Sequence, residues 1–128
     1  MEIRIYYEDT DCGGVVYYAN YLKYFERART HHLEEHGLSV ASLQQEGTWF
    51  LVTHAEVHYR SPARYGDVLQ IQTTVSSARK ASLTFHHRII ERHSARLVVE
   101  GSATLVPVNG QGKIIRLNPQ IVQELVTS

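Results

Sequence analysis

The chain has 128 residues, of which 43% are hydrophobic and 20% are charged, and its formal net charge is +0 at pH 7. A neutral chain creates no overall field that attracts nucleic acid or an anionic membrane surface, no apolar run approaches the ~20 residues of a bilayer-spanning helix, and the single cysteine, Cys12, excludes an internal disulfide framework. With a strand pattern starting almost at Met1 and no room before it for a signal peptide, we expect one soluble, cytoplasmic domain over residues 1–128.

The first part of the chain predicts a strand followed by a long helix. Met1–Glu8 alternates apolar and polar residues, as a half-buried strand does. Glu8–Gly14 is rich in acidic residues and glycine and is expected to form a loop. A helical pattern then runs from about Val16 or Tyr17 to about His36.

The rest of the chain predicts an antiparallel meander with short helical segments on either side of it. Gly37 is a suitable C-terminal cap for the long helix, and Asn118-Pro119 is a suitable start for a short helix that ends near Val126. Alternating segments separated by short breaks predict the strands between them. The expected elements are a helical turn at Ser39–Gln45, strands at Phe50–Tyr59, Asp67–Ala78, Ser82–Glu91 and Arg96–Pro107, and a last edge strand at Lys113–Leu117.

One long helix packed on such a sheet makes a domain of α+β class. A single helix covers only one face of the sheet, and an open sheet ends in an edge strand. We therefore expect a homo-oligomer, a dimer or a tetramer, in which sheets extend or pack across a two-fold axis.

The junction between the first strand and the long helix carries the residues best suited to chemistry. Asp9, Asp11 and the pair Gly13-Gly14 stand just ahead of the helix. Glycine allows a sharp turn and the close approach of a ligand, and a helix start presents N–H groups without backbone partners and a partial positive charge. A carboxylate there is suited to acyl transfer, because it can attack or activate water while the N–H groups stabilise the oxyanion. The alternative for Asp11 is the commoner role of capping the loop or the helix.

Residues 7–21, Tyr-Glu-Asp-Thr-Asp-Cys-Gly-Gly-Val-Val-Tyr-Tyr-Ala-Asn-Tyr, and Phe25–Arg29 resemble the hotdog-fold acyl-CoA thioesterases of the 4-hydroxybenzoyl-CoA type. The branch associated with the bacterial Tol-Pal system is the most similar. Weaker likeness continues through Tyr59–Asp67 and Ser82–Phe85. Two positions depart from the family pattern: relatives commonly have alanine or proline in place of Cys12, and some have proline in place of Ala19.

The resemblance implies a hotdog fold, in which a curled antiparallel sheet wraps a long helix, and dimers, often paired into tetramers, with the active site at the dimer interface. It implies hydrolysis of an acyl-CoA thioester to a carboxylic acid and CoA, without a metal or redox cofactor. The catalytic acid falls on Asp11, as nucleophile or general base, and the oxyanion donor falls on the backbone N–H of Tyr18.

Other residues are candidates for holding the substrate. The glycine pair would serve the turn and the approach of the acyl group, and tyrosines of the early helix would line an acyl pocket or pack in the core or an interface. The phosphates of CoA need cations, for which the resemblance favours a lysine and a serine of the sheet, although such residues are more often solvated surface groups. The candidate substrate-binding residues are Gly13, Gly14, Tyr17, Tyr21, Arg64, Lys80 and Ser82.

Alternative chemistries are less well supported by the sequence. Cys12 is a rival nucleophile, but no histidine stands near it in the sequence. His54, Glu56 and His58 share one strand face, yet the chain has no tight metal-binding signature, which favours a polar sheet face over a metal site.

Two other functions stay open beside the thioesterase. The first is a non-hydrolytic module that binds acyl-CoA or acyl carrier protein. The second is a hydratase or dehydratase of the same fold; these enzymes use a histidine-containing site, and the loop around Asp11 carries no histidine.

Overall fold

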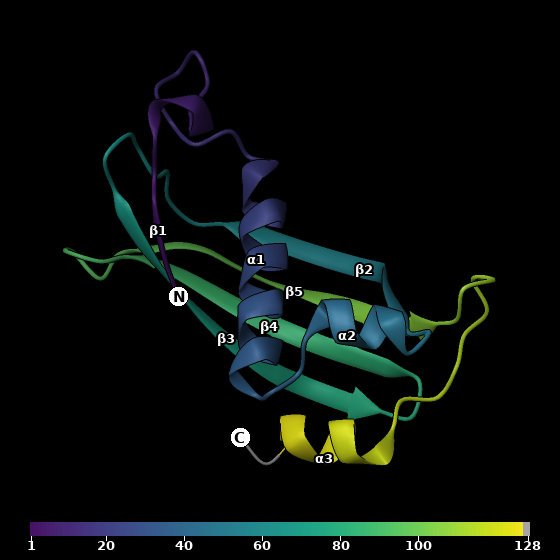
Figure 1. Ribbon diagram of the computed structural model, residues 1–128. Helices are drawn as coiled ribbons and strands as arrows, with labels where there is room; N and C mark the ends of the chain where they lie inside the picture. Colours follow the sequence, from purple (N-terminus) through teal and green to yellow (C-terminus); the bar gives the residue numbers. More distant parts are fainter. Residues whose placement is uncertain (127–128) are drawn as a thin grey trace.

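The computed structural model describes residues 1–126, which form one curled antiparallel sheet with a long helix lying across it (Figure 1). The long helix, α1, spans Asn20–Glu35, and a shorter helix, α3, lies near one end of the sheet. The elements in chain order are β1 (Glu2–Arg4), the 3-10 turn η1 (Tyr7–Asp9), α1, α2 (Val40–Gln45), β2 (Trp49–Tyr59), β3 (Val68–Arg79), β4 (Ser82–Glu91), β5 (Leu97–Val108) and α3 (Pro119–Val126).

The strand order in the sheet is β1-β3-β4-β5-β2, and all neighbouring pairs are antiparallel. The strands β3, β4 and β5 form a meander. The strand before the meander in sequence, β2, lies at one edge of the sheet beside β5. The short strand β1 lies at the other edge and pairs with the start of β3. The sheet therefore has a long edge strand, β2, of 11 residues.

The core lies between α1 and the sheet because each of the two elements turns one buried face toward the other. On β4, every second residue, from Leu83 through Phe85 and His87 to Ile89, is buried, and the residues between them are less buried. The side chains of α1 that are buried are Tyr21, Tyr24, Phe25, Ala28 and Leu33.

The predicted helix start was wrong by three or four residues. The N–H of Val16 donates to the carbonyl of Ala63 at 2.8 Å, and the chain at Val16 also forms a bridge with Thr10. The two valines before Tyr17 favour extended backbone because they are β-branched, so α1 begins only at Asn20. This keeps residues 15 and 16 in the strand-like segment that carries the Asp11 turn.

Three strand predictions also need correction. The first strand covers only Glu2–Arg4 and is followed by η1. The strand at 49–59 pairs with β5 and not with β3, because apolar alternation predicts a strand but not its neighbour. The segment Lys113–Leu117 is no edge strand; its backbone pairs with β5 at Val108 and then turns to Lys80, whose carbonyl accepts from the Leu117 N–H at 2.7 Å.

The other predicted strands agree with the structure within one residue, and α2 and α3 occur where they were expected. Within residues 1–126, no helix is long and apolar enough to cross a membrane.

Candidate active site

Asp11 occupies the first position of a tight hairpin turn ahead of α1. The N–H of Gly14 donates to the carbonyl of Asp11 at 3.0 Å, and the N–H of Asp11 donates to the carbonyl of Val15 at 2.9 Å. Gly14 has φ of +79°, a conformation that side chains with a Cβ rarely adopt. This pattern is that of a three-residue hairpin loop closed by a glycine bulge.

The two oxygens of the Asp11 carboxylate have different surroundings. The Oδ1 atom accepts a hydrogen bond from the N–H of Gly13 at 2.8 Å, which is an Asx turn. Within residues 1–126, the Oδ2 atom has no hydrogen-bond partner, and the side chain is exposed. Asp11 therefore caps the loop through Oδ1, which is the structural role that the sequence left open for it. Its second oxygen, Oδ2, faces solvent.

The hairpin is held in place by the segment between β2 and β3. Val15 forms a bridge with Arg64, so the predicted residue Arg64 lies beside the Asp11 turn. The N–H of Arg64 donates to Asp67 Oδ2 at 2.9 Å. The guanidinium of Arg96 donates to Ser61 Oγ at 2.8 Å, to the carbonyl of Pro62, and lies 3.7 Å from Asp67 Oδ2. These contacts fix the backbone against which the Asp11 turn packs.

Asp9 has a structural role in the same loop. Its Oδ2 atom accepts from the N–H of Tyr6 at 2.8 Å. Its carbonyl accepts from the N–H of Tyr17 at 3.0 Å and from the side-chain amide of Asn20, the first residue of α1, at 2.9 Å. Asp9 therefore ties the loop to the start of the helix.

The backbone N–H of Tyr18 lies in the turn that leads into α1, one residue before the N-cap Ala19. Among residues 1–126, no hydrogen-bond partner is found for this N–H, whereas the carbonyl of Tyr18 accepts from the Tyr59 hydroxyl at 3.1 Å. The N–H is thus available to a ligand, as an oxyanion donor has to be.

The tyrosines of this region fall into two groups. Tyr17 and Tyr18 are exposed, with ring centroids 4.9 Å apart. The neighbouring Tyr18 hydroxyl raises the pKa of Tyr17, and the charge of Asp11 adds to this effect. Tyr21 belongs to the core, and burial raises its pKa to about 12 against the opposing effects of the Ala63 backbone and Arg96.

Lys80 and Ser82 are not brought to Asp11 within one chain. They lie at the β3–β4 turn, next to α3, whereas the Asp11 loop lies beyond the N-terminal end of α1 (Figure 1). At ~3.3 Å per residue, the twelve residues of β3 span up to roughly 40 Å between these ends. Any site that uses both requires a second copy of the chain.

The alternative nucleophile and the alternative metal site gain no support. Cys12 is a free, exposed thiol. The imidazole Nε2 atoms of His54 and His58 lie 3.2 and 3.8 Å from the carboxylate of Glu56 on the exposed surface. Within residues 1–126, no group of three or more His, Cys, Asp or Glu side chains is arranged to hold a metal ion.

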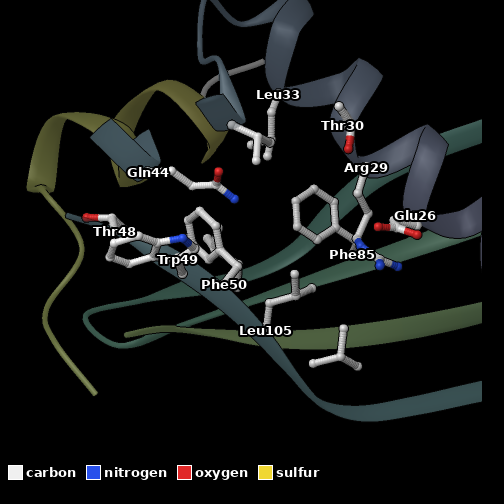
Figure 2. A pocket seen from close by; sticks show the side chains of 13 residues that line it. Glu26, Arg29, Thr30, Leu33, Gln44, Thr48, Trp49, Phe50, Phe85 and Leu105 are labelled. Atoms are coloured by element: carbon white, nitrogen blue, oxygen red, sulfur yellow. The ribbon is translucent and has the colours of Figure 1, made fainter. Parts of the chain in front are cut away.

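A cavity that the sequence did not reveal lies between α1, α2 and β2 (Figure 2). Its volume is about 210 Å³, and its walls combine apolar side chains such as Leu33, Phe50 and Phe85 with polar ones such as Thr30 and Gln44. Arg29 of α1 reaches its rim. Glu26 and Arg29 stand three residues apart, a spacing that predicts an ion pair on one helix face, but no such pair forms within residues 1–126. The sequence does not predict the cavity, because its walls come from residues far apart in the chain.

A long helix lying across a curled antiparallel sheet is the hotdog fold, and the relatives of this chain are thioesterases of that fold. The chain belongs to the thioesterase-like superfamily, whose family model matches residues 6–125. The acyl-CoA thioester hydrolase YbgC of Escherichia coli is 46% identical over 95 residues, which cover 74% of this chain and 71% of the relative.

Two further relatives agree in class. The acyl-CoA thioesterase YbgC of Haemophilus influenzae is 40% identical over 89 residues, or 69% of this chain and 65% of the relative. The solved structure of a 1,4-dihydroxy-2-naphthoyl-CoA thioesterase from Synechocystis has a TM-score of 0.91 and 25% identity, covering 100% of this chain and 94% of that chain.

Proposed function

We propose that the protein hydrolyses acyl-CoA thioesters to a free carboxylic acid and CoA, with Asp11 as the catalytic acid and the Tyr18 N–H as the oxyanion donor. The observation that carries this proposal is the Asp11 turn. Within residues 1–126, the exposed Oδ2 of Asp11 and the N–H of Tyr18, seven residues later in the chain, both lack a hydrogen-bond partner. The names of the YbgC relatives support acyl-CoA as the substrate. Membership of the Tol-Pal-associated branch, which the sequence motif around Asp11 resembles, is part of this proposal.

Two routes fit this pair of groups. In the first, Asp11 takes a proton from water while the water oxygen attacks the carbonyl carbon. In the second, Asp11 attacks the carbonyl itself and forms a mixed anhydride, which water then hydrolyses. In both routes the Tyr18 N–H stabilises the developing oxyanion, the C–S bond breaks, and CoA leaves as a thiolate that takes up a proton. Losing one such donor typically costs ~10²–10³ in rate.

The proposed enzyme is a cytoplasmic dimer or tetramer, and its CoA site uses Arg64 of one chain with Lys80 and Ser82 of another. The edge strand β2 supports oligomer formation, because Trp49, Leu51 and Val52 on it are exposed, the last two by 50% and 52%. A long edge strand with exposed apolar residues is prone to pair with another chain. Gly13, Gly14 and Tyr17 would line the approach of the acyl group, and Tyr21 would support it from the core.

A Gly13→Ala variant is expected to lower kcat about tenfold or more with little change in melting temperature. A Cβ atom at residue 13 would lie 3.2 Å from Asp11 Oδ1, closer than an ordinary contact, so the carboxylate would have to shift by a few tenths of an ångström. A misplacement of about 1 Å in a catalytic group can cost ~10² in rate. Steady-state kinetics and thermal unfolding of the same preparation test this expectation.

Gly14→Ala is the matched comparison. No atom lies within 4 Å of a Cβ placed there, but φ of +79° makes alanine unfavourable by about 1 kcal/mol. Its main effect is therefore expected on stability. Full activity of Gly13→Ala would show that the position of the Asp11 carboxylate in the turn does not matter for turnover.

The competing function is a module that binds acyl-CoA or acyl carrier protein without hydrolysis, and it is favoured by the structural use of Asp11 Oδ1 in the turn. Thiol release should be measured over a panel of short, long and aromatic acyl-CoAs and an acylated carrier protein, with binding followed by calorimetry. Thiol release from any member supports the hydrolase. Binding without release from every member would support the module instead.

A further inference from the structure

The cavity between α1, α2 and β2 lies apart from the Asp11 turn of the same chain. Arg29 stands nine residues after Asn20, so it lies about 14 Å along the helix from its start. Figure 2 shows the Arg29 side chain directed from α1 toward the cavity beside Phe85, with Phe50 and Trp49 on the opposite side. The catalytic chemistry proposed above makes no use of this arginine.

Arg29 carries a positive charge into a partly apolar environment without a direct partner. Its side chain is half-buried, and burial lowers its pKa, an effect that the charge of Glu26 opposes. Within residues 1–126, the guanidinium makes no hydrogen bond and no ion pair, and Glu26 itself is exposed to solvent. Charged groups withdrawn from water are normally paired and hydrogen-bonded, since leaving them unpaired is costly.

The groups behind Arg29 supply no negative charge. His87 of β4 is fully buried, stacks on Phe25 at 4.6 Å, and binds Thr73 Oγ1 through Nδ1 at 3.0 Å. Burial, and next the charge of Arg29, lower the pKa of His87 to about 3, so it is neutral at physiological pH. His32, the next neighbour on α1, also has a lowered pKa because of burial. The charged residues that line the cavity are therefore Arg29 and Glu26.

The size and the walls of the cavity limit what can bind there. Its 210 Å³ exceed the ~150 Å³ of an apolar cavity that holds benzene. The walls at Leu33, Phe50 and Leu105 suit an apolar group of about five to eight carbons, and the guanidinium suits a carboxylate, which it can bind through two parallel hydrogen bonds.

We propose that this cavity is a binding site for a small carboxylate with an apolar body, the carboxylate lying on Arg29 and the body between Phe50, Phe85 and Leu105. Two sources supply this chemistry. One is a free acid, including the acid released by thioester hydrolysis; the other is the terminal carboxylate of an acyl group derived from a dicarboxylic acid.

Calorimetric titration with hexanoate and with hexanamide, which has the same apolar body without the charge, tests the site. Hexanoate is expected to bind the wild-type protein about tenfold or more tightly than hexanamide. Arg29→Gln should remove this preference. Glu26→Gln should strengthen hexanoate binding by about two- to fivefold, because it removes the carboxylate nearest to Arg29. Equal binding of the two ligands, or no effect of Arg29→Gln in a folded protein, would overturn the proposal.

A second variant keeps the test independent of Arg29. Val40 of α2 lines the cavity, and Val40→Phe fills part of it while the guanidinium stays in place. This variant is expected to weaken hexanoate and hexanamide alike. Unchanged binding of both ligands to a folded Val40→Phe protein would contradict a site in this cavity.

Inhibition kinetics then separate the two sources. Noncompetitive inhibition of acyl-CoA hydrolysis by hexanoate indicates a site for free acids. Competitive inhibition, together with a preference for adipoyl-CoA over hexanoyl-CoA that Arg29→Gln abolishes, indicates that the cavity receives the terminal carboxylate of the acyl group. The binding measurements need no turnover, so they stand even if the proposed hydrolysis is not observed.

Discussion

Replacing Asp11 by asparagine is expected to lower kcat for acyl-CoA hydrolysis by about 10²- to 10⁴-fold, the usual contribution of a positioned acid or base. Asparagine retains a side-chain oxygen that can accept the hydrogen bond now made by the Gly13 N–H at 2.8 Å. The turn should therefore persist, while the side chain can no longer attack the carbonyl or take a proton from water. Thiol release at saturating substrate measures the effect, and circular dichroism with thermal unfolding checks the fold.

Cys12→Ala is the matched control for this experiment. Cys12 is the next residue in the same turn and is exposed, so both substitutions disturb the same short loop. The Cys12 variant should keep hydrolysis within about threefold of the wild type. The reverse pattern, an active Asp11→Asn protein and an inactive Cys12→Ala protein, would identify the Cys12 thiol as the nucleophile. An Asp11→Asn protein with full activity would refute the proposed mechanism whatever the control does.

The sequence was informative wherever one local pattern decides the outcome. Gly37 was expected to end the long helix, and it does so with φ of +76°, its N–H donating to the carbonyl of Glu34 at 3.0 Å while the N–H of Leu38 reaches Leu33 at 2.8 Å. The motif around Asp11 likewise indicated a glycine turn before a helix. Both features depend on residues that are near one another in the chain, and the likeness to a known family supplied the fold.

The features that the sequence did not reveal depend on contacts between distant segments. The position of β2 beside β5 is decided by packing over the whole sheet. The late start of α1 depends on the backbone hydrogen bond from the Val16 N–H to the Ala63 carbonyl. The role of Arg96 in holding residues 61–67 could not be read from an arginine near a turn. The arrangement of Arg29 in a cavity likewise requires α2 and β2 to be in place.

Substituting Gly101 by alanine is expected to destabilise the fold by about 3 kcal/mol or more, at the upper end of what overpacking costs. Gly101 lies in β5, paired with Val57 on one side and His87 on the other. A Cβ atom there would lie 2.2 Å from the carbonyl oxygen of Glu56 and 2.9 Å from the ring of Phe25. The first contact is with backbone inside a strand ladder, and the second is with a fully buried side chain of α1, so neither can move away cheaply.

Urea unfolding followed by far-ultraviolet circular dichroism measures this loss, and Gly110→Ala provides the control. A Cβ at residue 110 would meet only the Trp49 ring, at 3.5 Å, which is an ordinary contact. That variant should unfold within about 1 kcal/mol of the wild type, since it changes backbone entropy and little else. Because α1 crosses the sheet where Phe25 approaches Gly101, the same substitution should also weaken the packing of α1 on the sheet. The turn that contains the Tyr18 N–H leads directly into this helix. A Gly101→Ala protein as stable as the Gly110→Ala protein would mean that α1 does not approach β5 this closely.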